Sequence, residues 1–313
     1  MNRLTQAAKR RQGAVKWAQR HGKSSASRQY GVSLSSVKRW CKRYDGTWQS
    51  LQERSHRPRS HPRQHTPSEE CLIRQVFSKA YLRYGWSGVY SQLLEQHSYK
   101  RSFAGMYHAA TRMGLGWGKG RRRPKRALRR YPELSMPGEK VQIDVKVVPY
   151  HCLKGVAKRD GKRLYQWTAI DECTRLRYVY GYEEHTPENS VDFLERLQTA
   201  FPFRIQVIQT DNGTEFTYRF ISKTEMCPFE SALAEKGIVH KLIPPRTPWQ
   251  NGKVERSHRN DQWYFYDWEK FADVDELNHK LKTHLTWSNN RAMRTLDWNS
   301  PIQRLHDFLG SHH

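Results

Sequence analysis

The sequence predicts a multidomain protein in which all-α units precede an α/β domain. Three observations support this division. Apolar residues before position 116 recur at helical spacing, whereas those from position 141 onward alternate as in β-strands. Basic charge is concentrated in the first part, because residues 1–140 hold 31 Lys and Arg against 7 Asp and Glu, and residues 141–313 hold 24 against 23. Stretches rich in Pro, Gly and Arg separate the parts, as linkers do.

The net charge of +25 indicates the kind of partner that the chain has. Like charges crowded onto less than half of a chain repel one another and destabilise its compact state unless a polyanion neutralises them. We therefore expect nucleic acid as a partner. The mean hydropathy of -0.93 and an amino terminus interrupted by charge argue against a transmembrane helix and a secretory signal. A cytoplasmic protein without a membrane partner is expected, and the five scattered cysteines suit a reducing compartment.

Residues 1–53 are predicted to form a DNA-binding domain, with three short helices within residues 4–44. Ser33 is a suitable N-cap for the third helix, and Gly31 suits the tight turn before it. Residues 34–44 place apolar side chains on one face, and the other face carries Lys38, Arg39, Lys42 and Arg43. This pattern is typical of a helix-turn-helix whose last helix enters the major groove. A small helical bundle with a basic face is the alternative interpretation.

A second helical unit is predicted between two basic linkers. Residues 54–66 are rich in Pro and Arg, which argues against metal binding by the neighbouring His56, His61 and His65. Residues 67–115 are predicted to form a second helix-turn-helix-like domain, whose first helix Thr66 caps and Pro67 opens. Residues 116–140 are expected to be an Arg-rich linker. Its arginines could bind a phosphate backbone or enter a minor groove, or they could simply be solvated; they include Arg121, Arg122, Arg123 and Arg126.

Residues 141–270 are predicted to fold as an α/β core. The first strand alternates, and its apolar face carries Val141, Ile143, Val145 and Val147. The elements that follow are a hairpin over 164–182 with its turn at 171–174, a helix from Thr186 and Pro187, a strand over 204–213, a helix over 231–237, a strand over 238–243 and a helix from about Gln250. The order βββαβαβα is the layout of a ribonuclease-H-like core. Residues 271–313 are expected to form a C-terminal helical tail.

Three carboxylates lie where such a core would build a metal site. Asp144 is in the middle of the first strand, Asp211 closes the fourth strand before an Asn-Gly turn, and Glu255 lies in the last helix. These places come together in a βββαβαβα core, where the carboxylates could hold two Mg²⁺ ions. Each also has a simpler interpretation, Asp211 as a turn residue and Glu255 as the partner of Arg259 in a surface ion pair. Asp171, at the hairpin turn, is interpreted as structural.

Three motifs of the chain resemble those of a known family. VQIDV, TDNGTEF and PPRTPWQNGKVERSH are similar to the signatures of the DDE transposase and retroviral integrase superfamily, specifically the bacterial insertion-sequence transposases with an integrase core. The resemblance covers roughly residues 140–300. It implies that Asp144, Asp211 and Glu255 form a catalytic, metal-binding triad for two Mg²⁺ ions, with Mn²⁺ able to substitute.

The resemblance also implies an activity and its partners. The enzyme would bind the terminal repeats of a mobile DNA element, cleave the element ends and join the 3′-hydroxyl ends to target DNA by two-metal transesterification. Double-stranded DNA would be the partner, and pairing two ends demands a homodimer or a higher homo-oligomer. A bacterial, nucleoid-associated location is then expected. The side chains expected to hold the scissile phosphates are Arg246, Lys253, Arg256 and Arg259.

The chain departs from the family in one spacing, and two other classes of function are compatible with its sequence. The 43 residues between Asp211 and Glu255 exceed the family's commonest spacing, so we expect an insertion around residues 217–231. A DNA-binding regulator could keep the core only as a scaffold, but three intact carboxylates argue against it. A metal-dependent nuclease without strand transfer would share the fold, although two DNA-binding units and a basic arm exceed what it needs.

Overall fold

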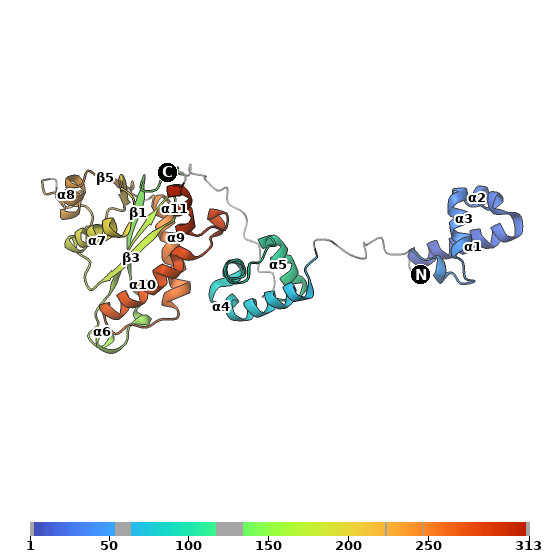
Figure 1. Cartoon of the computed structure of the whole chain (residues 1–313), viewed down its shortest axis with the longest axis horizontal. Coiled ribbons are helices and arrows are strands. Elements are labelled where there is room, and N and C mark those ends of the chain that lie inside the picture. Colours follow the sequence, from blue (N-terminus) through green and yellow to red (C-terminus); the bar gives the residue numbers. More distant parts are fainter. Residues whose placement is uncertain (1–2, 54–63, 117–133, 223, 246, 311–313) are drawn as a thin grey trace. The chain divides into compact units, whose positions relative to one another are not determined.

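The computed structural model divides into two compact units, Met1–Gln64 and His65–His313, called unit 1 and unit 2 below (Figure 1). The structure describes residues 3–53, 64–116, 134–222, 224–245 and 247–310. Several side chains named above lie outside these ranges, namely His56, His61, Arg121, Arg122, Arg123, Arg126 and Arg246. Within the ranges, none of the helices has the length and apolarity that crossing a membrane requires.

Unit 1 is helical, as predicted. Its elements are α1 (Arg3–His21), α2 (Lys23–Tyr30), α3 (Leu34–Arg43) and a 3-10 turn (Gln49–Leu51). Gly31 adopts a left-handed conformation with φ of 62° after α2, and the Ser33 side chain accepts the backbone N–H of Ser36 at the start of α3. Ala18, Ala26 and Val37 form the small buried core. The three predicted helices and both turn signals are confirmed, whereas DNA binding by a helix-turn-helix stays a prediction.

Unit 2 begins with two further helices, α4 (Pro67–His97) and α5 (Phe103–Arg112). Thr66 caps α4 and forms a reciprocal capping box with Glu69, which confirms the predicted start. The helix α4 bends at Gly85, where φ is 60° and the helical conformation is interrupted. Contacts such as the stacking of Phe103 on Trp298, with ring centroids 5.1 Å apart, place these helices in one compact unit with the α/β core.

The core is a five-stranded mixed sheet in the order β3-β2-β1-β4-β5. Its strands are β1 (Val141–Val147), β2 (Tyr165–Asp171), β3 (Arg177–Tyr182), β4 (Val207–Thr210) and β5 (Val239–Leu242). The first three strands pair antiparallel, and β4 and β5 continue from β1 in parallel. The helices are α6 (Gly155–Arg159), α7 (Pro187–Ala200), α8 (Pro228–Glu235), α9 (Gly252–Asp261), α10 (Val274–Asn290) and α11 (Pro301–Gly310). The predicted order βββαβαβα is confirmed and fits a ribonuclease-H-like fold, with the short α6 as an unpredicted addition after β1.

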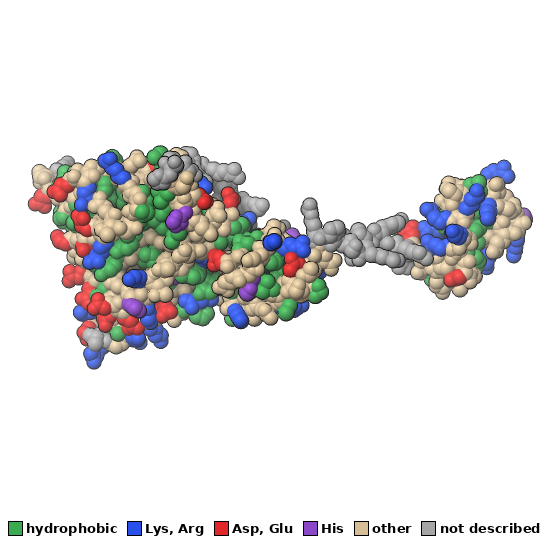
Figure 2. All heavy atoms as spheres, viewed as in Figure 1, with side chains coloured by type: hydrophobic (Ala, Val, Ile, Leu, Met, Phe, Trp, Pro, Cys, Tyr) green, Lys and Arg blue, Asp and Glu red, His purple; other side chains and the backbone are tan. Residues whose placement is uncertain are grey.

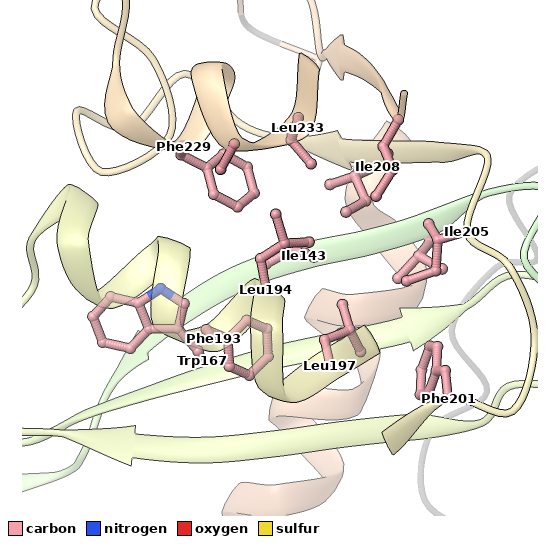
Figure 3. Packing of buried hydrophobic residues seen from close by; sticks show 14 of the residues in the cluster. Ile143, Trp167, Phe193, Leu194, Leu197, Phe201, Ile205, Ile208, Phe229 and Leu233 are labelled. Carbon is pink, nitrogen blue, oxygen red and sulfur yellow. The ribbon is translucent and has the colours of Figure 1, made fainter. Parts of the chain in front are cut away.

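Helices cover both faces of the sheet, and the alternation of β1 decides which side chains each face receives. On one face, α7 packs its Phe193, Leu194 and Leu197 against Ile143 of β1 and Trp167 of β2, as Figure 3 shows. On the other face, the polar residues of β1 contact α9, and α10 packs on β3. The predicted apolar face of β1 ends early, because Val147 is 50% exposed where the strand leaves the sheet.

Candidate active site

The strand register brings the first two carboxylates of the predicted triad together. In the parallel pair β1–β4, Gln142 stands beside Gln209. Asp144 and Asp211 each follow two residues later, on the same face of the sheet as the preceding glutamine, because side chains alternate along strands. The sequence pattern Gln-x-Asp therefore occurs on both neighbouring strands and leads to one place at the sheet edge.

The turn after β4 fixes the second carboxylate. Asp211 Oδ1 accepts the backbone N–H of Gly213 at 3.0 Å, and the Asn212 amide donates to the carbonyl of Ile243 at 2.9 Å, just beyond β5. A Cβ on Gly213 would lie 2.3 Å from a carboxylate oxygen of Glu215, so only glycine leaves room for Glu215 to fold back over the turn. Glu215 is buried and forms an ion pair of 2.8 Å with His185.

The third carboxylate lies on α9, whose first turn is held by the two glutamines of the strands. The Gln142 side-chain oxygen accepts the backbone N–H groups of Lys253 at 3.2 Å and Val254 at 3.1 Å. The side-chain amides of Gln142 and Gln209 both donate to the carbonyl of Gln250, at 2.9 and 3.0 Å. These contacts satisfy backbone groups that a helix start leaves unpaired. Neither glutamine was predicted as a site residue, although a polar side chain on a buried strand is a usable signal.

The negative charges of the other predicted carboxylates act on Asp144. Burial and then the negative charge of Asp211 raise the pKa of Asp144 to about 7, with smaller contributions from Glu255 and Glu215, whereas a backbone hydrogen bond opposes the rise. In the described ranges, no three His, Cys, Asp or Glu side chains are gathered closely enough to form a ready metal-binding group. The donor chemistry nevertheless fits a hard divalent cation, because oxygen ligands from carboxylates are what Mg²⁺ prefers, and its charge would relieve the repulsion at Asp144.

His258 and Lys146 flank Asp144 from α9 and β1. His258 Nδ1 lies 3.5 Å from Asp144 Oδ2, and burial lowers the pKa of His258 to about 4, so the imidazole is neutral at pH 7. Its Nε2 atom is buried without a hydrogen-bond partner. Lys146 Nζ donates to the His258 carbonyl at 3.3 Å and to Gln262 Oε1 at 2.9 Å, which ties α9 to β1.

The basic residues predicted to contact DNA fall into two groups. Some are exposed, and others are bound to partners within the protein. Those with exposed side chains are Lys38, Arg39, Lys42, Arg256 and Arg259. Lys253 instead forms an ion pair of 2.8 Å with the buried Glu172. Arg43 donates to the carbonyls of Ser50, at 2.9 Å, and Gln52. On the face of unit 1 that Figure 2 shows, Lys and Arg side chains dominate the charged surface.

Asp171 has the structural role that was predicted for it. Its carboxylate accepts the backbone N–H of Gly138 at 2.9 Å and both the backbone N–H and the hydroxyl of Thr174 at 2.7 Å. These bonds close the hairpin turn between β2 and β3. Both carboxylate oxygens are thus engaged, one by the turn and one by the segment before β1, which accounts for a structural role.

Family models and known proteins are similar to the carboxyl-terminal part of the chain. Two models described as integrase core domain match residues 135–248 and 236–301. A putative integrase (ORF3) of Spiroplasma virus SpV1-C74 is 31% identical over 156 residues, which are 46% of this chain and 42% of that protein. A retrovirus-related Pol polyprotein from transposon RE1 of Arabidopsis thaliana is 30% identical over 93 residues, 29% of this chain and 6% of that protein.

The chain spans less than half of the length of either relative. Among solved structures, the catalytic core domain of BIV integrase is similar with 19% sequence identity and a TM-score of 0.39, over 56% of this chain and 99% of that chain. The matched family regions contain Asp144, Asp211 and Glu255.

Proposed function

Because the chain is a member of the DDE transposase and integrase superfamily, we propose that it is a transposase that acts on the ends of a mobile DNA element. It binds the terminal repeats, cleaves phosphodiester bonds at the element ends and joins the 3′-hydroxyl ends to target DNA. The observation that carries this proposal is that the negative charges of Asp211 and Glu255 both act on the partly buried Asp144.

The three carboxylates would hold two Mg²⁺ ions, or Mn²⁺ in their place. Such ions, when bound, supply activation of a water molecule and stabilisation of the leaving 3′ oxygen. Asp144 and Asp211 are fixed by the sheet and its edge turn, and Glu255 is carried by a helix whose start two glutamines hold. The exposed Arg256 and Arg259 stand beside Glu255 on α9 and would position the scissile phosphates. The protein's part is therefore positioning and charge, without a covalent nucleophile.

A strand-joining assay tests this proposal. The full chain is incubated with Mg²⁺, duplexes that end in a 3′-hydroxyl and a supercoiled plasmid, and products with a covalently joined end are counted. Asp144→Asn, Asp211→Asn and Glu255→Gln should each reduce joining at least 100-fold, because a ligand charge is worth several kcal/mol of transition-state stabilisation. DNA binding, measured by gel shift, should stay nearly unchanged.

A matched control is Glu235→Gln, which removes an exposed carboxylate at the end of α8 and should leave joining intact. Near-normal joining by any of the three site variants would show that the triad is wrong. Cutting of DNA by the wild-type chain without any joined product would instead identify a nuclease and contradict the proposal of a transposase.

A further inference from the structure

A pocket lined by aromatic side chains lies between the bend of α4 and the π-helical turn Gln262–Tyr266 that continues α9. Its volume is about 430 Å³. The rings and the guanidinium that line it are those of Tyr81, Arg83, Tyr84, Trp263, Tyr264 and Trp268. Both elements belong to unit 2. None of these residues was used in the proposed catalytic chemistry.

The two tryptophans of this aromatic pocket are exposed, and one of them, Trp268, is held in place. Trp263 is 51% exposed and Trp268 is 53% exposed, a large apolar area to leave open to water. The indole N–H of Trp268 donates to the carbonyl of Trp263 at 2.8 Å. The Arg83 guanidinium lies 5.3 Å from the centre of the Trp268 ring and donates to the carbonyl of Tyr264 at 2.8 Å. The Trp268 ring is therefore fixed before any ligand arrives, which lowers the entropy cost of stacking on it.

A chain of hydrogen bonds connects this pocket to the candidate active site. Lys146 follows Asp144 by two residues on β1, and its Nζ donates to Gln262 Oε1 at 2.9 Å. The amide of Gln262 in turn donates to Asp267 Oδ1 at 2.7 Å, and Asp267 lines the pocket. Asp267 of the pocket is thus linked through Gln262 to Lys146, which lies on the strand that carries Asp144.

Exposed side chains lead along the chain from the third carboxylate to the pocket. Glu255 and Arg259 lie four residues apart on α9, and Trp263 follows four residues later in the π-helical turn that continues it; all three are exposed. Eight residues at 1.5 Å each correspond to roughly 12 Å. Successive nucleotides of a strand rise by about 3.4 Å, so this distance covers three to four nucleotides. A strand whose phosphate lies at Glu255 would pass Arg259 before it reaches the pocket.

We propose that the aromatic pocket binds an unpaired base of the DNA substrate, about three to four nucleotides from the scissile phosphate, by stacking on Trp263 and Trp268. This inference rests on the proposed function, because it names a subsite for the same substrate. Flat rings and a guanidinium recognise the π-face of any base, and the face of a base is free only when it has left the duplex stack. The Asp267 carboxylate at the wall can accept hydrogen bonds from ring N–H and amino groups.

The polarity of the pocket favours a base over a protein segment. Arg83 and Asp267 place both signs of charge in its wall, and Leu82 is its exposed aliphatic side chain. A protein interface of ordinary strength needs a larger continuous apolar centre. The exposed Arg256 and Arg259 on the way from Glu255 offer contacts to phosphates, which a protein partner does not carry.

Three DNA probes test the proposal in a binding assay without divalent cations. The full chain is titrated into a fluorescent blunt duplex, the same duplex with a short single-stranded 3′ extension, and a third duplex whose extension has abasic sugars. The wild-type chain should bind the extended duplex more tightly than the other two. Trp263→Ala and Trp268→Ala should weaken binding to the extended duplex roughly 5-fold to 100-fold, the range for one lost stacking ring, and leave binding to the blunt duplex unchanged.

Two variants serve as matched controls. Trp249→Ala removes an equally exposed tryptophan, at 51%, that does not line the pocket, and the preference for the extended duplex should remain. Trp263→Phe keeps a ring and should keep most of the preference. Thermal unfolding of each variant establishes that it is folded. If Trp249→Ala lost the preference for the extended duplex to the same extent, the assignment of base binding to this pocket would be contradicted.

Other outcomes would overturn the proposal. Equal binding of the extended and abasic probes by the wild-type chain would show that no base is recognised. Tryptophan variants that keep the preference but change the oligomeric state in sedimentation would identify a protein interface. Glu255→Gln should keep the preference while strand joining is lost, so the two proposals fail separately. If the wild-type chain joins strands but does not prefer the extended duplex, only the base pocket is excluded. If it prefers the extended duplex but joins no strands, only the transposase is excluded.

Discussion

At the scale of single residues, Asp261 shows how a buried charge ties α9 to the sheet. The side chain is fully buried, with Oδ2 2.5 Å from an Arg177 nitrogen and Oδ1 2.9 Å from His284 Nε2. The Gln166 amide also donates to Oδ2, at 3.0 Å. Burial alone would raise the pKa of Asp261, but Arg177 and His284 outweigh it and hold the pKa well below its usual range.

Asp261→Asn should therefore destabilise unit 2 by about 3–5 kcal/mol at pH 7, because Arg177 would be left buried without its counter-charge. The folded-state pKa is depressed, so the stability from ionised Asp261 is present above the unfolded value of about 3.9 and is lost as the pH falls further. The difference between wild type and variant should shrink below about pH 4. Urea denaturation followed by circular dichroism at pH 7 and pH 3.5 measures both effects.

An exposed pair provides the control for that measurement. Arg159 and Asp160 lie 3.7 Å apart with half or more of the arginine side chain in water. Asp160→Asn should change the free energy of unfolding by less than about 1 kcal/mol at either pH. If Asp261→Asn lowered the free energy of unfolding by no more than Asp160→Asn does, Arg177 would have found another partner.

The residues of the candidate site were predicted unequally well from the sequence. The positions of Asp144, Asp211 and Glu255 could be predicted because strand alternation and turn chemistry are local signals. The ion pair between Lys253 and Glu172 could not be predicted, because Glu172 is 81 residues away and reaches Lys253 only through the folded hairpin. Arg43 was likewise predicted from one helix face, whereas its partners lie in the turn that follows the helix.

At the scale of elements, the anchoring of α9 by Gln142 has consequences for both stability and activity. Gln142→Ala removes the acceptor for two buried backbone N–H groups, which should cost about 1–3 kcal/mol. Strand joining should fall as well, since Glu255 lies on the first turn of this helix. Chemical denaturation and the joining assay measure the two effects. Gln206→Ala, on an exposed side chain just before β4, should change neither.

The helix α3 carries the next prediction. Lys38 and Arg39 are exposed on the face away from Val37, so Lys38→Ala or Arg39→Ala should weaken and relax sequence-selective DNA binding by roughly 5-fold to 100-fold. Arg43→Ala should instead destabilise unit 1, because its guanidinium holds the carbonyls of Ser50 and Gln52. Gel shifts at several salt concentrations, together with thermal unfolding, separate the two. If all three variants lost DNA selectivity equally and none lost thermal stability, the assignment of Lys38 and Arg39 to DNA recognition and of Arg43 to the stability of unit 1 would be contradicted.

The element order was predictable, but the packing around the bend of α4 was not. Apolar periodicity in residues 67–97 indicates helix on both sides of Gly85, where the helical conformation is interrupted. The ring of Tyr84 packs against Tyr264 and Trp287 with centroids 5.7 and 5.1 Å apart. Such contacts join segments about 180 to 200 residues apart, and no local pattern encodes them.

At the scale of the whole molecule, the division into two units bears on how two DNA ends are handled. Unit 1 is compact by itself, and the sequence predicts a linker over residues 54–66. We expect catalysis in trans, in which the DNA-binding units of one copy hold one element end while its core acts on the other. A site that works only after both ends are paired would not release a single broken end.

Mixing two inactive variants measures this arrangement. One carries Lys38→Ala and Arg39→Ala, so it binds DNA ends poorly, and the other carries Glu255→Gln. In trans, each supplies what the other lacks, so the mixture should restore part of the joining that neither shows alone. Failure of the mixture despite hetero-oligomers confirmed by pull-down would favour action in cis.

The order of the site residues along the chain has a consequence for synthesis. A ribosome completes unit 1 first, then β1 with Asp144 and the turn with Asp211, and only later α9 with Glu255. A product whose translation stops before residue 252 would hold the basic unit 1 without the helix that bears the third carboxylate. If unit 1 binds element ends as we propose, such a fragment would occupy them and leave them uncut. Premature termination of this chain would then make a competitor of its full-length copies.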